Sequence, residues 1–124
     1  MTRYLLPPFI QSALNRGHAV EQFLGGFEYE GSPALRWLTL QPEEDGVTLL
    51  VYESYDEGGE DFLDLYAFSE IDGEQGDSAA EHPCATLDEA LTLARTRYGA
   101  DPERWVNEGV VQDEYQDYLT RGRR

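Results

Sequence analysis

The fold is decided by residues 34–53, which read ALRWLTLQPEEDGVTLLVYE. In an extended chain, residues 34–41 place Leu35, Trp37 and Thr39 on one face and the intervening side chains on the other. After the polar turn at 42–46, residues 47–53 are β-branched and apolar, as is typical of a strand. Two such runs joined by a short turn that contains glycine predict an antiparallel hairpin.

The neighbouring segments extend this hairpin into a predicted four-stranded meander. Residues 62–68 alternate between Leu63 and Leu65 on one side and Phe62 and Tyr66 on the other, which predicts a fourth strand. Residues 20–30 fit both a helical and a strand period. We expect a strand from near Phe23, with a bulge or bend at residues 25–26, and helix stays an alternative.

Helix signals lie at both ends of the chain. Pro8 opens an apolar run that ends at Gly17, and residues 86–89 form a capping box before a run that ends at Gly99. Residues 101–105 and 111–119 predict two further helices, whereas residues 69–83 read as an acidic loop. The predicted fold is a single α+β domain over residues 1–124, a four-stranded antiparallel meander sheet with an N-terminal helix and C-terminal helices packed on one face.

The charge of the chain is strongly uneven. Residues 17–94 hold nineteen acidic side chains and a single basic one, Arg36, so this stretch carries a formal charge of −18 within a chain of −16. Such a field repels nucleic acid and attracts cationic surfaces. We therefore expect a basic protein partner and no direct contact with nucleic acid. Genome composition or salt adaptation would also produce an acidic chain without lysine, and this alternative stays open.

Several classes of protein are disfavoured by composition. The chain has no lysine, which excludes Schiff-base chemistry and the phosphate-binding loop that needs Gly-Lys. The single cysteine excludes an internal disulfide framework. The sequence shows neither a leader segment nor a run of about 20 apolar residues, so we expect a cytoplasmic protein with no membrane contact.

Candidate catalytic and metal-binding groups are few. His82 and Cys84 are two residues apart, but no flanking motif supplies an orienting group or an oxyanion hole. Zinc would have only His18 in addition to this pair. The acidic segment 72–77 lacks the ligand spacing of a calcium loop. We predict no catalytic residue, no metal and no cofactor, and hence a protein that is not an enzyme.

The run from residue 52 to residue 66 is the strongest candidate for an interface. Tyrosine is enriched in interface cores, and clustered acids accelerate encounter with a basic partner. The same pattern is typical of a solvated hairpin with half-buried tyrosines and a charged edge, and both interpretations stay open. The predicted partner-binding residues are Tyr52, Tyr55, Asp56, Glu57, Glu60, Asp61, Asp64 and Tyr66.

The leading functional hypothesis is a non-enzymatic module that neutralises or escorts a basic partner, such as a toxin-immunity or antitoxin-like inhibitor. One alternative is a nucleic-acid mimic that inhibits a DNA-binding protein. Another is a small enzyme or ligand-binding domain whose pocket lies between sheet and helices and is lined by Trp37, Trp105 and Tyr98.

Overall fold

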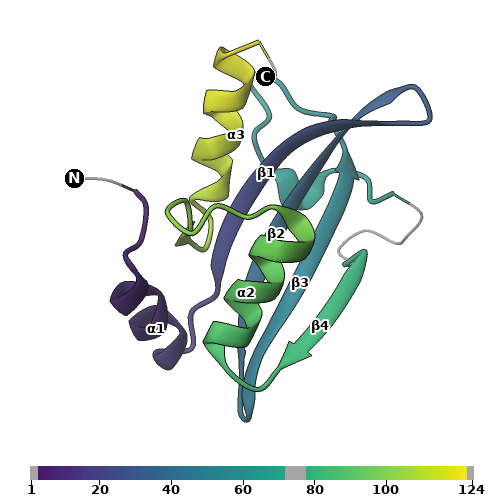
Figure 1. The fold of residues 1–124 in the computed structure, drawn as a ribbon. Helices are drawn as coiled ribbons and strands as arrows, with labels where there is room; N and C mark the ends of the chain where they lie inside the picture. The colour runs from purple at the N-terminus through teal and green to yellow at the C-terminus, as the bar shows by residue number, and fades with distance from the viewer. Residues whose placement is uncertain (1–2, 72–77, 123–124) are drawn as a thin grey trace.

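The computed structural model describes residues 3–71 and 78–122. Three helices and a five-stranded sheet make up these residues (Figure 1). In chain order, the elements are α1 (Pro7–Asn15), β1 (Val20–Tyr29), β2 (Ser32–Glu43), β3 (Gly46–Tyr55), the 3-10 turn η1 (Leu65–Ala67), β4 (Ala80–Cys84), α2 (Leu87–Tyr98), β5 (Val106–Asn107) and α3 (Val111–Thr120).

The sheet is antiparallel with the strand order β4-β3-β2-β1-β5. The α+β class with an antiparallel sheet is thereby confirmed, whereas the predicted number of four strands is wrong. The hairpin predicted from residues 34–53 forms the centre of the sheet, where Ala34 pairs with Tyr55 and Glu43 pairs with Gly46. Residues 20–29 are a strand, and the register between β1 and β2 shifts between Phe23 and Gly25, which confirms the predicted irregularity.

The predicted strand over residues 62–68 is wrong. These residues leave the sheet and form η1, whose first turn is capped by the Asp64 carboxylate accepting from the Tyr66 amide. Tertiary packing overrides the alternation, because the 3-10 turn buries Leu65 and Phe68 together and a strand would separate them onto opposite faces. The chain then returns to β3, where the Tyr55 amide donates to the Ser69 carbonyl at 2.9 Å.

The outer edge of β3 is occupied by β4, within a segment expected to be a loop. Val47 pairs with Cys84 at one end of this ladder and Val51 pairs with Ala80 at the other. The acidic segment 72–77, considered above as a calcium loop, lies outside the described residues.

Two apolar cores lie on the two faces of the sheet. Leu38 and Leu40 face the same side as their cross-strand partners on β3, and this side packs on buried residues of α1 and α2. Leu35 and Trp37 face the other side, which packs on η1 and α3. The arrangement with all helices on one face is therefore not confirmed. Both alternating sets of β2 are apolar, so each face of the sheet needs a cover.

The helix ends follow the local signals in part. The Thr86 hydroxyl accepts from the Glu89 amide at 3.1 Å at the start of α2, and Gly99 ends this helix with a φ of +74°. The helix predicted over residues 101–105 is wrong, because Asp101 there closes only a turn by accepting from the Glu103 amide at 2.9 Å. None of the helices within the described residues is both long and apolar enough to cross a membrane.

Candidate functional site

The segment between β3 and its return at Ser69 carries most of the predicted interface residues. It is held against α3 by a row of aromatic rings. The Phe68 ring lies 5.1 Å from the Phe62 ring and 5.5 Å from the Tyr115 ring, both edge-to-face. Within this segment, the side chains of Leu65 and Phe68 are fully buried. These contacts give an irregular stretch of chain the support of a packed core.

Two of the predicted acids hold this segment in place. Asp56 accepts a hydrogen bond from the Tyr115 hydroxyl, and Glu57 accepts one from the Ser69 amide at 2.6 Å. Both carboxylates therefore have a structural role. The sequence analysis had assigned these two residues to partner binding alone.

Two of the predicted tyrosines belong to the sheet. The Tyr52 ring stacks on the Trp37 ring with centroids 5.4 Å apart, and the Tyr55 ring lies edge-on to Tyr29 at 6.3 Å. Tyr52 is the cross-strand partner of Trp37, whereas Tyr55 pairs with Ala34. Both tyrosines are half-buried, as the alternative interpretation of a solvated hairpin anticipated.

The remaining predicted residues are exposed, and one exposed aromatic residue was missed. Phe62 keeps 42% of its surface exposed and Tyr66 keeps 39%. The sequence analysis placed Phe62 on one face of a predicted strand, and no pattern in the sequence indicated that its ring is exposed. We call the exposed set the acidic–aromatic surface; it consists of Glu60, Asp61, Phe62, Asp64 and Tyr66.

The Tyr66 ring is fixed by a buried carboxylate. Its hydroxyl donates to Glu21 Oε1 at 2.6 Å, and the Gly109 amide donates to the same oxygen at 2.9 Å. Glu21 is only 3% exposed, and this burial raises the pKa of its carboxyl group despite the hydrogen bonds that favour ionisation. Burial and the bond to Glu21 raise the pKa of Tyr66, so its hydroxyl stays protonated and continues to donate.

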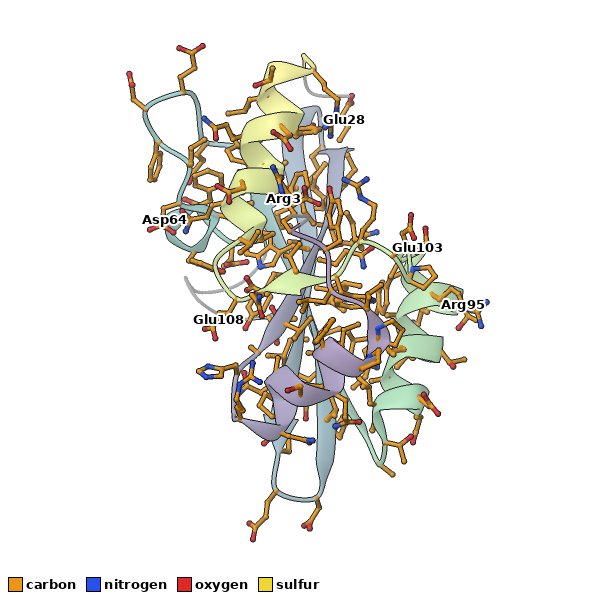
Figure 2. The ribbon with its side chains drawn as sticks, turned by 90° about the vertical axis from the view of Figure 1, so that its left-hand side faces the viewer. Arg3, Glu28, Asp64, Arg95, Glu103 and Glu108 are labelled. Carbon is orange, nitrogen blue, oxygen red and sulfur yellow. The ribbon has the colours of Figure 1, made fainter. Side chains whose placement is uncertain are left out.

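The acids of the acidic–aromatic surface have no counter-charge among the described residues. The ion pairs among the described residues join Arg3, Arg36 and Arg104 to the carboxylates of Glu53, Glu114 and Asp117, and none of these carboxylates belongs to the acidic–aromatic surface. Figure 2 shows Asp64 and Glu108 on one side of the molecule, with Arg95 on the opposite side. The surface therefore presents uncompensated negative charge around two exposed rings.

The segment with His82 and Cys84 has the geometry of a structural contact. A ring nitrogen of His82 lies 2.6 Å from the Tyr98 hydroxyl, and the Cys84 thiol donates to the His82 carbonyl. Burial raises the pKa of Cys84, which is the opposite of what an activated thiolate needs. Within residues 3–71 and 78–122, no group of three or more His, Cys, Asp or Glu side chains is placed to hold a metal ion.

The predicted pocket between Trp37, Trp105 and Tyr98 is not formed by these residues. Trp37 belongs to the core beneath α3, whereas Trp105 and Tyr98 belong to the core on the opposite face of the sheet. Both tryptophans are 1% exposed.

Comparison with known proteins supplies no relative: no protein family model, no curated protein and no solved structure matches the chain.

Proposed function

We propose that this protein is a binding module that neutralises or escorts a basic partner protein, which it engages through the acidic–aromatic surface. A toxin-immunity or antitoxin-like inhibitor is the concrete form of this function. The observation that carries the proposal is the placement of two exposed rings, Phe62 and Tyr66, among three carboxylates without a counter-charge in the described chain.

The rings supply the binding energy in this proposal. Aromatic residues dominate interface hot spots because they bury a large area for few rotatable bonds. Phe62 rests on Phe68, and Tyr66 is hydrogen-bonded to Glu21, so both rings are ordered before a partner arrives. A preordered ring loses little conformational entropy on binding.

In this proposal, the carboxylates raise the association rate and select for a cationic partner. Glu60 and Asp61 are exposed beside Phe62, and Asp64 is exposed beside Tyr66. Carboxylates at the edge of an interface accelerate the encounter with a cationic surface, and salt screens this effect. A partner with an apolar pocket inside a ring of Arg or Lys side chains fits this combination.

The test begins with identification of the partner. A photo-crosslinking amino acid at position 62 captures the contacting protein in the native host, and the same amino acid at position 9 serves as the control. Phe9 is also exposed, at 58%, but belongs to α1. A basic protein captured from position 62 and absent from position 9 is then purified for kinetics.

Association kinetics with the purified partner separate local charge from net charge. The triple variant Glu60→Gln, Asp61→Asn, Asp64→Asn should lower the association rate constant about fivefold or more at low salt. The matched control replaces the three exposed acids at 43–45, at the end of β2 and in the turn that leads to β3, and removes the same charge. We expect the control to change the rate by less than about twofold.

A further variant tests the rings. Phe62→Ala should raise the dissociation rate constant by about tenfold or more, as truncation of a hot-spot residue does. Equal effects of the two charge variants, together with an unchanged dissociation rate for Phe62→Ala, would refute the proposed surface.

A further inference from the structure

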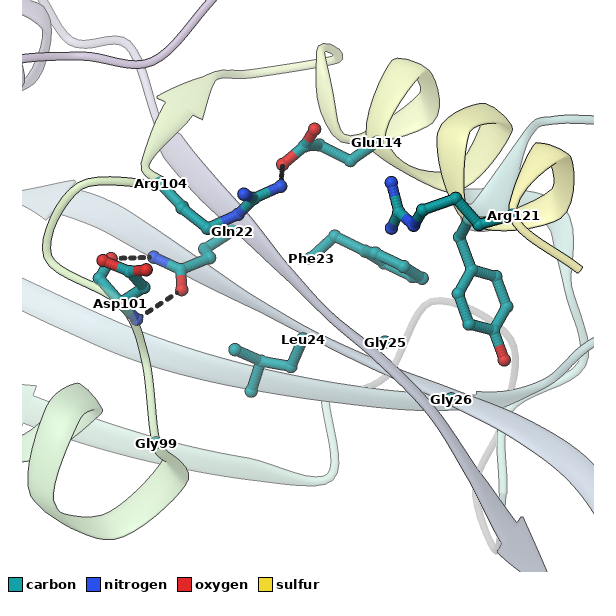
Figure 3. Close-up of a pocket in the computed structure, with 11 residues that line it drawn as sticks. Gln22, Phe23, Leu24, Gly25, Gly26, Gly99, Asp101, Arg104, Glu114 and Arg121 are labelled. Atoms are coloured by element: carbon teal, nitrogen blue, oxygen red, sulfur yellow. Dashed lines mark hydrogen bonds and ion pairs between the residues drawn. The ribbon is translucent and has the colours of Figure 1, made fainter. Parts of the chain in front are cut away.

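A cavity of about 510 Å³ lies beside the irregular part of β1 (Figure 3), and none of its lining residues belongs to the acidic–aromatic surface. Its walls come from β1, from the loop after α2 and from α3. The lining residues include Phe23, Leu24, Gly25, Arg104, Glu114 and Arg121. A volume of this size accommodates a ligand as large as an amino acid or a small aromatic acid.

The floor of the cavity is formed where the register of β1 shifts against β2. Beyond the shift, Gly25 has a φ of +100°, and a Cβ built there would have no atom within 4 Å. At Gly26, by contrast, a Cβ would collide with the Tyr118 hydroxyl, so glycine is needed for α3 to approach the strand. Phe23 and Leu24 lie at the floor beside this bulge and give it an apolar lining.

The left wall in Figure 3 is fixed by a reciprocal amide contact. Gln22 is 2% exposed, and its side chain donates to the Asp101 carbonyl at 2.9 Å and accepts from the Asp101 amide at 2.7 Å. This pair ties the loop after α2 to β1. The loop thereby holds Arg104 at the cavity.

Two guanidinium groups approach the cavity from opposite sides. Arg104 extends from the loop after α2 and Arg121 from the end of α3, and Figure 3 shows them pointing toward one another above Phe23. Arg104 stacks over the Tyr4 ring at 4.8 Å, and its Nη2 donates to the Tyr4 hydroxyl at 2.7 Å. The structure shows no hydrogen bond from its Nη1 to a described residue, so this edge of the guanidinium is available to a ligand.

The acid in contact with Arg104 is already engaged by other donors. Glu114 is 3% exposed and accepts from Arg3 at 2.8 Å, from the Tyr4 hydroxyl at 2.9 Å and from Arg104 at 3.3 Å. With its charge shared between two arginines, Glu114 anchors the site and leaves little capacity to bind a cation. In a chain of net charge −16 with nine arginines, the cavity thus brings two arginines to one lining, where Glu114 is already shared with Arg3.

We propose that this cavity binds an organic monocarboxylate with an apolar body. The carboxylate lies between Arg104 and Arg121, because guanidinium donors match carboxylate geometry, and the body lies on Phe23 and Leu24. A single negative charge fits better than a phosphate dianion, because Asp101 also lines the cavity and the net charge of the chain opposes a second one.

The test is a titration of the full chain with phenylacetate, followed by the backbone amide resonances of Gly25 and Gly26. We expect saturable shifts with a dissociation constant of about 1 mM, and binding about tenfold weaker for the neutral phenylacetamide and for phenyl phosphate. Equal binding of phenylacetate and phenylacetamide, or no saturable shift up to about 20 mM, would overturn the proposal.

Variants locate the carboxylate. Arg121→Gln should weaken phenylacetate binding about fivefold or more, whereas Arg95→Gln, an exposed arginine on α2, removes the same charge and should change it less than about twofold. Leu24→Trp should weaken binding by filling the floor without changing charge. Equal losses for the Arg121 and Arg95 variants would show a non-specific charge effect and refute the site.

Two sources of the carboxylate are separated by peptides. The peptide Gly-Gly-Phe with a free carboxyl terminus is compared with its amidated form and with phenylacetate. Tighter binding of the free peptide indicates the carboxyl terminus of a protein, and tighter binding of phenylacetate indicates a free acid. The amidated peptide binding as well as the free one would contradict the proposal. Because the cavity and the acidic–aromatic surface share no residue, failure of either proposal leaves the other intact.

Discussion

Replacing Glu21 with glutamine tests whether the desolvation cost of this buried carboxylate, beside the acidic–aromatic surface, outweighs the hydrogen bonds that it accepts. The substitution removes the charge and keeps the shape. Glu21 Oε1 accepts from Tyr66 and Gly109, and a glutamine carbonyl oxygen accepts from the same two donors. The other carboxylate oxygen lies 3.5 Å from the Thr39 hydroxyl, where a glutamine N–H finds an acceptor.

The expected magnitude is the difference of two opposing terms. Hydrogen bonds to a charged acceptor contribute about 1.5–3 kcal/mol each and those to a neutral one about 1 kcal/mol, so the loss over two bonds is roughly 1–4 kcal/mol. Removing a carboxylate from a site that is 3% exposed recovers a desolvation cost of several kcal/mol. Burial raises the pKa of Glu21, which means that the second term is the larger one. We expect Glu21→Gln to increase the free energy of unfolding at neutral pH by about 1 kcal/mol, or the melting temperature by about 3–5 °C.

The pH dependence gives the sign of the effect independently. Because the native carboxyl group has a pKa above the ordinary 4.5, it binds its proton at a higher pH than the unfolded chain does. Its contribution to stability is present in full below the unfolded pKa and is lost as pH rises through the folded pKa. The advantage of Glu21→Gln should therefore be largest near neutral pH and shrink on acidification.

The assay is chemical denaturation of the wild type, of Glu21→Gln and of the control Glu103→Gln at several pH values and constant ionic strength. Glu103 is exposed, so its variant should track the wild type. A Glu21→Gln variant less stable than wild type by more than about 1 kcal/mol at neutral pH, or an advantage that grows on acidification, would refute the reasoning.

Two further predictions concern the turn that carries the acidic–aromatic surface and the charge of the chain. Gly58→Ala should lower the free energy of unfolding by about 1–3 kcal/mol in thermal melts, since a Cβ there would lie 2.6 Å from both the Phe62 carbonyl oxygen and the Phe68 ring. Its neighbour Gly59 has no atom within 4 Å of such a Cβ, so Gly59→Ala is the matched control and equal losses would contradict the packing argument. The melting temperature of the wild type should rise between about 20 and 300 mM NaCl because salt screens the repulsion among the acids, and a fall would show that specific ion pairs dominate.

Local signals in the sequence were sufficient for the centre of the fold. The hairpin over residues 34–53, the cap at Thr86 and the helix end at Gly99 formed as expected, and the irregularity expected at residues 25–26 lies between Phe23 and Gly25. Each of these depends on residues a few positions apart, namely on period-two alternation, on a side chain that reaches a nearby amide or on the conformational freedom of glycine.

The candidate site was predicted only in part, because its geometry depends on contacts between residues far apart in the chain. Clustered acids and tyrosines marked residues 52–66, but composition did not distinguish Asp56 and Glu57, which accept hydrogen bonds that hold the segment, from Glu60 and Asp61, whose carboxylates accept none from a described residue. That distinction depends on donors from Tyr115 and the Ser69 amide, which are brought there by tertiary packing. The exposure of Phe62 was equally invisible to sequence reasoning.

The sequence by itself determined the α+β class, the antiparallel central hairpin and the charge distribution, because these follow from composition and short-range pattern. Only the tertiary structure decided that β4 and not residues 62–68 pairs with the edge of β3, and that Leu65 and Phe68 cover the face opposite α2. Either segment could have supplied backbone hydrogen bonds to that edge. The choice depended on which apolar side chains could be buried together, and burial is a property of residues distant in the chain.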